Sequence, residues 1–341
     1  MSAATSLDAD TLVAVEQLQA AVRRRFGTQA RISNVTPTTV GGSNRTLLFD
    51  LHERAAARRL VLRQETISAD YTPFLPASRQ YPVLRVAFEH GLPVPEPVFM
   101  LEPADGMGDG YVVGAIRGES LPKTLLTAAS FATARTRFLE QAGACLARLH
   151  AIDIREPALD GLRDVRESGD PLAAWTHYYD LWEEPHPVIE YALRWLDINR
   201  PQSAGKVLVH GDFRLGNMLV ATEGLRALLD WECAHFGDAL EDLGWFCTRS
   251  WRLHRTDRPA GGLGQRAALY DAYERAGGAP VDPQAARWWE IFGLMRWALY
   301  NLMQIFGHQS GRRRSPAFAA CGRNTSLIEY DLLMTISGHY D

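Results

Sequence analysis

Apolar and polar positions recur along the chain with two different periods, and the change of period divides the sequence. From about Thr11 to Phe26 the apolar positions recur at helical spacing, and Asp10 precedes them as a candidate N-cap. Shorter runs with strand-like alternation follow, separated by turns rich in glycine and charged residues. These runs predict strands at residues 32–36, 46–51 and 59–63, a fourth strand reached through residues 91–99, and a fifth within residues 111–118.

Helical spacing dominates the remaining two thirds of the chain. We expect a helix from about Ser130 to His150, and two helices broken near residues 185–187 within the aromatic segment 173–196. Another aromatic helix is predicted at residues 288–306, and residues 311–316 are predicted to be a solvated loop. The pattern therefore predicts a strand-rich first part and a helix-rich second part.

The stretch at residues 207–232 carries the clearest chemical signal. A short apolar strand runs into a polar loop, and a hairpin predicted at residues 218–229 then ends in an acid. The loop presents Asp212 and Asn217, and the hairpin returns Asp230. Oxygen ligands from Asn217 and Asp230 suit Mg²⁺, which prefers a few such ligands together with substrate phosphates. Asp212 then remains free to accept a proton from a substrate hydroxyl.

The longer motif resembles a known family. Residues 210–217 read His-Gly-Asp-Phe-Arg-Leu-Gly-Asn, residues 229–232 read Leu-Asp-Trp-Glu, and residues 237–245 read Gly-Asp-Ala-Leu-Glu-Asp-Leu-Gly-Trp. This spacing is similar to the kinase catalytic loop and its metal-binding aspartate. The chain resembles the aminoglycoside phosphotransferase and choline kinase-like family, closest to the phosphotransferase domains associated with acyl-CoA dehydrogenases.

The resemblance implies a fold and a division of the chain. We expect an α+β, bilobal protein-kinase-like fold, with a small N-lobe of mainly antiparallel β-structure and a larger, mainly α-helical C-lobe. The N-lobe would span residues 1–118 and the C-lobe residues 119–341. The resemblance also implies that ATP and Mg²⁺ are the cofactors.

The same resemblance assigns residues to the nucleotide. The glycine-rich turn would lie over the ATP phosphates, Arg63 would take the place of the usual lysine on the third strand, and the hinge backbone would pair with adenine. A Gly-Gly turn between strands is usually only a hairpin, so its phosphate role rests on the resemblance. The residues implied are Gly41, Gly42, Ser43, Asn44, Arg63, Gly114, Ala115 and Ile116.

One position departs from the family pattern. A glutamate that pairs with the basic residue is expected on the next helix, but the chain has Gln80, followed by Pro82. Proline suits a first helical turn, so this helix is predicted to begin at Tyr81 or Pro82. Either a neutral hydrogen bond replaces the ion pair, or another acid such as Glu65 or Glu89 substitutes.

The resemblance implies transfer of the γ-phosphoryl group of ATP to the hydroxyl of a small molecule, and this reaction gives each remaining residue of the motif a role. Asp212 would orient the acceptor hydroxyl and accept its proton, and Arg214 would stabilise charge on the transferring group. His210 is expected to shape the loop through hydrogen bonds, and Asp242 resembles the acid that braces the loop from the next helix. We interpret Asp238 and Glu241 as a structural capping box.

Composition limits the class of protein and its partners. The 341 residues are 46% hydrophobic and 22% charged, and the net charge of −4 implies no nucleic-acid partner. The four cysteines show neither metal spacing nor a disulfide framework, which fits a reducing, cytoplasmic environment. The N-terminus lacks the pattern of a signal peptide, and no apolar run reaches membrane-spanning length, so no membrane partner is expected.

The acceptor is less sharply indicated than the reaction. From Arg249 to the end of the chain, twelve arginines stand against eight acids, which favours a neutral or anionic small-molecule hydroxyl acceptor. The favoured acceptor is a hydroxyacyl compound or its CoA thioester. A nucleotide-binding pseudokinase and an aminoglycoside or macrolide kinase remain as alternatives. The aromatic segment 173–196 would either shape the acceptor pocket or pack in the core. Acceptor identity, ATP or GTP preference and oligomeric state stay open.

Overall fold

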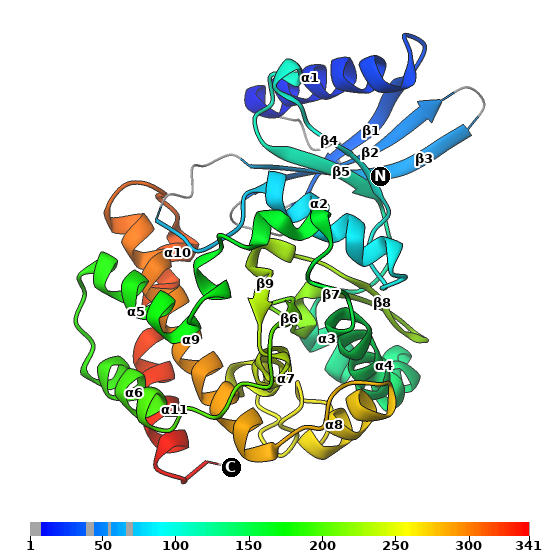
Figure 1. The fold of residues 1–341 in the computed structure, drawn as a ribbon. Helices are drawn as coiled ribbons and strands as arrows, with labels where there is room; N and C mark the ends of the chain where they lie inside the picture. Colours follow the sequence, from blue (N-terminus) through cyan, green and yellow to red (C-terminus); the bar gives the residue numbers. More distant parts are fainter. Residues whose placement is uncertain (1–7, 39–43, 54–55, 66–70, 341) are drawn as a thin grey trace.

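The computed structural model describes residues 8–38, 44–53, 56–65 and 71–340. Its first part is an antiparallel sheet with strand order β1-β2-β3-β5-β4, and helix α1 (Ala9–Phe26) packs on it (Figure 1). The described strands of this sheet are β1 (Arg31–Pro37), β2 (Asn44–Glu53), β3 (Ala56–Glu65), β4 (Pro97–Met100) and β5 (Gly110–Gly114). The predicted strands of the first part are therefore confirmed, with β2 and β3 longer than expected.

Helix α1 begins earlier than predicted. Asp8, not Asp10, is its N-cap, because Asp8 is extended and its carboxylate accepts the backbone N–H of Thr11 at 2.7 Å. Asp10 lies in the first turn, where its negative charge interacts favourably with the positive end of the helix dipole. Leu18 and Val22 face the sheet and share a buried core with its inner residues. The sheet and α1 thus form one packed unit.

Helix α2 (Ala77–Glu89) contradicts the expected start at Tyr81 or Pro82. The carboxylate of Glu65 accepts the backbone N–H of Ala77, which fixes the first turn four residues before Tyr81. Pro82 consequently lies inside the helix, where it removes one backbone donor. This start turns Gln80 inward, where it is 2% exposed.

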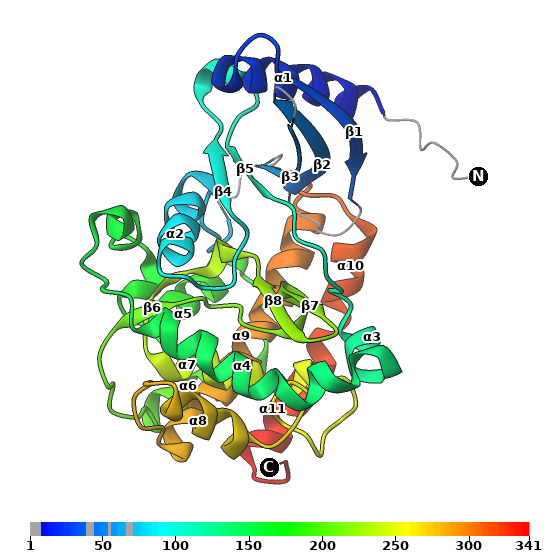
Figure 2. The same ribbon diagram turned by 90° about the vertical axis from the view of Figure 1, so that its right-hand side faces the viewer.

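The second part is mainly helical. Figures 1 and 2 show the sheet and α1 at one end of the molecule and these helices at the other. The described helices are α3 (Pro122–Thr127), α4 (Ala132–His150), α5 (Pro171–Trp182), α6 (Pro187–Ile198), α7 (Ala239–Cys247), α8 (Arg266–Arg275), α9 (Pro283–Gln309), α10 (Pro316–Gly322) and α11 (Thr325–Ile336). The predicted helices at 130–150, on both sides of 185–187, and at 288–306 are confirmed. Within the described ranges, none of the helices has the length and apolarity needed to cross a bilayer.

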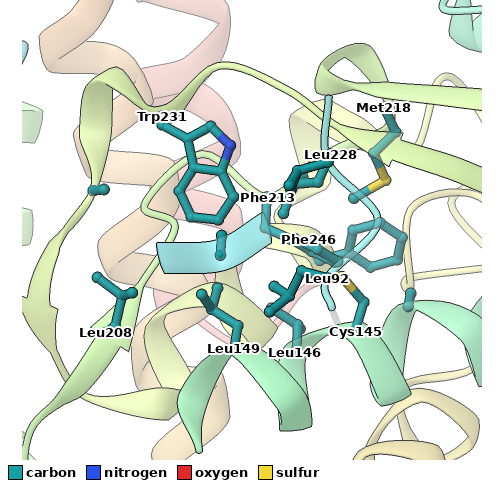
Figure 3. Close-up of a cluster of buried hydrophobic side chains, with 14 of the residues drawn as sticks. Leu92, Cys145, Leu146, Leu149, Leu208, Phe213, Met218, Leu228, Trp231 and Phe246 are labelled. Carbon is teal, nitrogen blue, oxygen red and sulfur yellow. The ribbon is translucent and has the colours of Figure 1, made fainter. Parts of the chain in front are cut away.

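Short strands between the two parts carry the motif. Strand β6 (Val207–Val209) pairs with β9 (His235–Gly237), and β7 (Met218–Ala221) forms the predicted hairpin with β8 (Gly224–Leu228). Figure 3 shows the apolar cluster that supports them. The cluster includes Phe213, Met218, Leu228, Trp231 and Phe246, together with Leu146 and Leu149 of α4. The loop at residues 210–217 is therefore mounted on a packed core.

The boundary predicted at residues 118 and 119 stays a prediction. Near it, Glu119 pairs with Val220 of β7 in an isolated antiparallel bridge, so the chain meets the motif hairpin directly after leaving β5. This bridge connects the segment after β5 to the elements that carry the motif.

Candidate active site

The motif loop is held in place by Asp242 of α7. The Asp242 carboxylate accepts the backbone N–H of His210 at 2.8 Å and that of Gly211 at 2.9 Å, and it lies 3.2 Å from His150 Nε2. Burial would raise the pKa of Asp242, but the His150 hydrogen bond lowers it below its usual value. Gly211 has φ of 76°, and a Cβ there would lie 2.2 Å from the Cys233 carbonyl oxygen. The loop conformation therefore requires glycine at 211 and an ionised acid at 242, which matches the bracing role expected of Asp242.

His210 shapes the loop as a neutral ring. Its Nδ1 accepts the backbone N–H of Asp212 at 3.2 Å, so the ring proton is on Nε2, which donates to the Leu229 carbonyl at 2.9 Å. The ring is fully buried, and burial lowers the pKa of His210. These contacts match the predicted structural role of His210.

Three side chains orient the carboxylate of Asp212. Arg214 Nε donates to Oδ1 at 2.9 Å, Trp245 Nε1 donates to the same oxygen at 2.8 Å, and Asn217 Nδ2 donates to Oδ2 at 2.5 Å. Asp212 and Arg214 both line the large cleft described below. The sequence did not single out Trp245 as a site residue. The signal available was its place at the end of the motif at residues 237–245.

Asn217 and Asp230 are joined through the backbone. The N–H of Leu229 donates to the carbonyl of Asn217 at 2.8 Å, which ties the end of the hairpin to the loop. The Asn217 amide nitrogen also donates to the Asp212 carbonyl, so its Oδ1 is the atom left for a cation. Asp230 has φ of 62°, an uncommon left-handed conformation that redirects the chain at the site.

These residues fit a cation that is bound together with a nucleotide. Among the residues that the structure describes, no group of three or more His, Cys, Asp or Glu side chains forms a complete metal site. Asn217 Oδ1 and the Asp230 carboxylate are hard oxygen donors, and Mg²⁺ usually takes one or two carboxylates with water and phosphate oxygens. Such a donor set binds Mg²⁺ well only when the nucleotide supplies the remaining ligands.

Arg63 of β3 is paired across the site. Its Nη1 forms an ion pair with Asp230 Oδ1, and its Nη2 lies 4.0 Å from Glu232 Oε2. Burial would raise the pKa of Asp230, but Arg63 lowers it below its usual value. Burial, with the neighbouring charge of Asp230, raises the pKa of Glu232 to about 7. Arg63 thus has carboxylate partners, and they come from the segment directly after the motif hairpin.

Gln80 makes neutral hydrogen bonds instead of an ion pair. Its Nε2 donates to the Leu75 carbonyl at 2.7 Å, and its Oε1 accepts the Tyr111 hydroxyl at 3.2 Å. Glu89, one of the substitutes considered from the sequence, lies 3.6 Å from Arg85 on the surface of α2. The acids paired with Arg63, Asp230 and Glu232, were not among the substitutes considered.

The predicted residues of the glycine-rich turn, Gly41, Gly42 and Ser43, lie outside the described residues. Asn44 begins β2, and only its backbone is described. Their role toward phosphate therefore stays a prediction. The other nucleotide-binding candidates, Arg63 and the hinge residues 114–116, all line the cleft.

A cleft of about 890 Å³ runs between the sheet and the helical part, and Asp212, Arg214 and Asp230 line it. Asn217 is 3% exposed and is not among the described residues that line the cleft. The hinge end of the cleft is apolar and carries the backbone of residues 114–116. The backbone N–H of Gly114 donates to the carbonyl of Glu96, and that of Ala115 donates to the carbonyl of Arg59. The N–H of Ile116 is therefore the donor that the hinge offers to a base. The apolar residues at this end include Leu48, Val61, Val113, Leu219 and Leu228.

The other end of the cleft is aromatic and was not predicted. We call it the acceptor wall, and it consists of Trp297, Tyr300, Met303, Gln304, Arg313 and Phe318. The loop predicted at residues 311–316 is confirmed as far as Ser315 and is mostly exposed, but Arg313 within it is half-buried and lines the cleft. The predicted segment 173–196 contributes no described residue to the cleft. Trp175, Tyr179 and Trp182 pack in the core instead.

Several of the C-terminal arginines that suggested a basic face are paired inside the protein. Arg252 is buried and forms an ion pair with Glu290, which also binds Arg266 and Arg287. Arg249 pairs with Asp331 at 3.2 Å. Glu241 likewise serves buried ion pairs, with His235 and Arg296, so it is structural but does not close a capping box. The excess of arginine therefore does not map onto the cleft as a whole.

The comparisons with known proteins place this geometry in a family. A model of the phosphotransferase enzyme family matches residues 34–287, and the chain belongs to that family. This confirms the predicted enzyme class, a small-molecule phosphotransferase with an alcohol group as acceptor. The resemblance proposed from the motif is confirmed as well.

Curated relatives include two mouse proteins. Acyl-CoA dehydrogenase family member 11 of Mus musculus is 29% identical over 225 residues, which are 64% of this chain and 28% of that protein. Family member 10 of the same organism is 26% identical over 201 residues, 57% of this chain and 18% of that protein. The chain thus spans less than a third of the length of these relatives.

Solved structures share the fold along almost the whole chain. A Ralstonia eutropha protein assigned by name to the aminoglycoside phosphotransferases has a TM-score of 0.72 and 23% identity, covering 95% of this chain and 98% of that one. Ethanolamine kinase of Plasmodium vivax has a TM-score of 0.64 and 12% identity, with coverage of 96% and 91%. Spectinomycin phosphotransferase, in complex with ADP and spectinomycin, has a TM-score of 0.61 and 12% identity, with coverage of 94% and 98%. The predicted bilobal α+β kinase-like fold is confirmed.

Proposed function

We propose that this phosphotransferase moves the γ-phosphoryl group of ATP, bound with Mg²⁺, to a hydroxyl group of a small molecule. The observation that carries the proposal is the fixed Asp212 carboxylate, which three donors orient at the cleft. The ADP complex of spectinomycin phosphotransferase, which shares the fold, supports a nucleotide in this cleft.

The nucleotide and Mg²⁺ would occupy the hinge end of the cleft and the adjoining motif. Adenine would lie against the apolar hinge end and accept a hydrogen bond from the N–H of Ile116. Arg63 would exchange its carboxylate partner for phosphate, a bidentate role that suits a guanidinium. Asn217 and Asp230 would hold Mg²⁺, which when bound neutralises phosphate charge.

At the reacting end, Asp212 orients the acceptor hydroxyl and accepts its proton as the new phosphate ester forms. Arg214, whose guanidinium lies over the Trp251 ring at 4.8 Å, stays beside Asp212 and offers positive charge to the transferring group. Most of the rate acceleration would come from this positioning and from electrostatics.

The favoured acceptor is a hydroxyacyl compound or its CoA thioester. Two observations support this: the acyl-CoA dehydrogenase family relatives contain a matching region, and the acceptor wall is mainly apolar and aromatic. Among the described residues of that wall there is no carboxylate, which a polycationic antibiotic would need. Cytoplasmic placement remains part of the proposal.

The test is ADP release with ATP and Mg²⁺ over a panel of alcohols, hydroxy acids, their CoA thioesters, aminoglycosides and macrolides. We expect turnover with a hydroxyacyl compound, and a loss of about 10²–10⁴-fold in kcat for Asp212→Asn. The control is Asp257→Asn, because the Asp257 side chain is 79% exposed.

Nucleotide binding without turnover of any acceptor would instead indicate the pseudokinase alternative, which the Gln80 substitution suggested. Efficient turnover of aminoglycosides or macrolides alone would overturn the acceptor preference.

A further inference from the structure

Arg313 is a charged side chain that is fixed in position at the acceptor wall. It lies in the short connection between α9 and α10, and its backbone N–H donates to the carbonyl of Gly307 at 2.8 Å. Its guanidinium carbon lies 4.4 Å from the centre of the Phe318 ring on α10. The backbone bond and the stacking together reduce the freedom of a side chain that would otherwise be mobile.

One nitrogen of the Arg313 guanidinium is left unsatisfied by the described part of the chain. This atom, Nη2, is buried and has no hydrogen-bond partner among the residues that the structure describes. Burial lowers the pKa of Arg313, which means that its charge is not fully compensated. Among the described residues, Glu232 is the carboxylate whose charge acts on Arg313, and Glu232 lies 4.0 Å from Arg63. A buried donor without a partner costs free energy and calls for an explanation.

A second unsatisfied atom lies on the same wall. The Oε1 atom of Gln304 is buried and has no described hydrogen-bond partner. Gln304 follows Trp297 and Tyr300 at helical spacing on the face of α9 that lines the cleft. Within the described part of the chain, one wall therefore presents a cationic donor and a neutral acceptor without partners, together with aromatic side chains.

We propose that Arg313 forms the anion-binding subsite of the acceptor, so that the molecule phosphorylated carries an anionic group in addition to its hydroxyl. The inference rests on the proposed function and narrows its acceptor class. The anionic group is a carboxylate, as in a free hydroxy acid, or a phosphate, as in a CoA thioester, since a guanidinium binds both in the same way. Gln304 receives a hydroxyl or amide N–H of the same molecule, and the aromatic residues cover its hydrocarbon part.

The test separates binding from turnover by using ligands without a transferable hydroxyl. Octanoate, octanol and octanoyl-CoA are titrated into the wild-type protein, Arg313→Gln and Arg314→Gln, and the dissociation constants are measured by calorimetry. Arg314 is the matched control, because it is the next residue in the same loop and is exposed. We expect Arg313→Gln to weaken binding of octanoate, octanoyl-CoA or both by about tenfold or more, and to leave octanol unchanged.

The pattern of losses identifies the source of the charge. Loss with octanoate indicates a carboxylate, and loss with octanoyl-CoA alone indicates a phosphate. The inference is overturned if Arg313→Gln binds both anions as the wild type does, if octanol weakens equally, or if Arg314→Gln has the same effect. Because no probe is phosphorylated, a failure of the proposed kinase reaction would leave this result intact and would show itself only in the turnover panel.

Discussion

At the scale of single residues, the orientation of Asp212 depends on a side chain that is distant in sequence. The indole N–H of Trp245 lies 2.8 Å from Asp212 Oδ1, the same oxygen that Arg214 contacts. The guanidinium carbon of Arg296 also lies 4.1 Å from the centre of the Trp245 ring. The indole therefore connects the Asp212 carboxylate to the buried charges below the loop.

Trp245→Phe removes this donor and keeps most of the ring. We expect kcat to fall by about tenfold, because a hydrogen bond to a charged group is lost, while the KM for ATP changes little. Trp288→Phe is the matched control, since it removes an indole N–H that binds the Leu196 carbonyl at 2.9 Å, away from the cleft. Equal kcat for Trp245→Phe and wild type in steady-state assays would show that the indole does not position Asp212.

Spacing predicted the candidate site residues that lie close together in the chain, whereas Arg63 and the hinge residues were implied by the family resemblance. Asp212, Asn217 and Asp230 fall within one loop and hairpin, so their spacing alone indicated a shared site. Trp245 and Arg313 reach the cleft only because α7 and the α9–α10 connection pack beside it. For Trp245 the available signal was its place at the end of the motif at residues 237–245. For Arg313 there was none, because an arginine-rich turn that lines a cleft looks the same in sequence as an exposed one.

At the scale of elements, α2 shows how this chain manages without the expected glutamate. Gln80 is buried and uses both ends of its amide group: the nitrogen donates to the Leu75 carbonyl, and the oxygen accepts the Tyr111 hydroxyl. A carboxylate at this position would keep the contact with Tyr111 but lose the donor. The helix is therefore adapted to a neutral side chain.

Gln80→Glu should consequently destabilise the protein rather than restore a phosphate clamp. We expect the free energy of unfolding to fall by about 2–3 kcal/mol in urea titrations, because the Leu75 carbonyl loses its partner and an acid is buried. Gln29→Glu, an exposed substitution of the same chemistry, should have little effect. An unchanged stability with tighter ATP binding in Gln80→Glu would mean that an acid here reaches Arg63.

The period of the sequence predicted the type of most elements but not where α1 and α2 begin. The start of α1 depends on Asp8 reaching Thr11, and Asp10 offers the same kind of side chain two residues later. The start of α2 depends on Glu65, which is the last residue of strand β3. Such long-range capping cannot be inferred from apolar spacing.

At the scale of the whole molecule, a buried charge network joins α7, β9 and α9 beneath the loop. Arg296 donates to the Gly211 carbonyl at 2.7 Å and to Glu241 at 2.5 Å, and His235 Nε2 lies 3.1 Å from Glu241. Burial would lower the pKa of His235, but Glu241 raises it to about 9. His235 is therefore protonated in the folded protein at neutral pH.

This network makes stability depend on pH in a defined direction. Because the folded pKa of His235 lies above its unfolded value of about 6.5, the stabilisation is complete below about pH 6.5 and is lost as pH rises through about 9. We expect the difference in unfolding free energy between wild type and His235→Gln to shrink by on the order of 3 kcal/mol across that range. His177→Gln, an exposed control, should give a flat difference, and a flat difference for His235→Gln would contradict the assignment.

The ion pair between Arg63 and Asp230 has a consequence for what can occupy the cleft. It joins β3 of the sheet to the segment that follows β8, so a ligand that binds here has to separate two opposite charges at once. Orthophosphate or metal-free ATP would satisfy the guanidinium and leave the carboxylate facing added negative charge, while a bare divalent ion would do the reverse. Under the proposed function, a complex of a cation and a polyphosphate supplies an anion to Arg63 and a cation to Asp230 at the same time. The cleft therefore selects the complex over either of its two components alone.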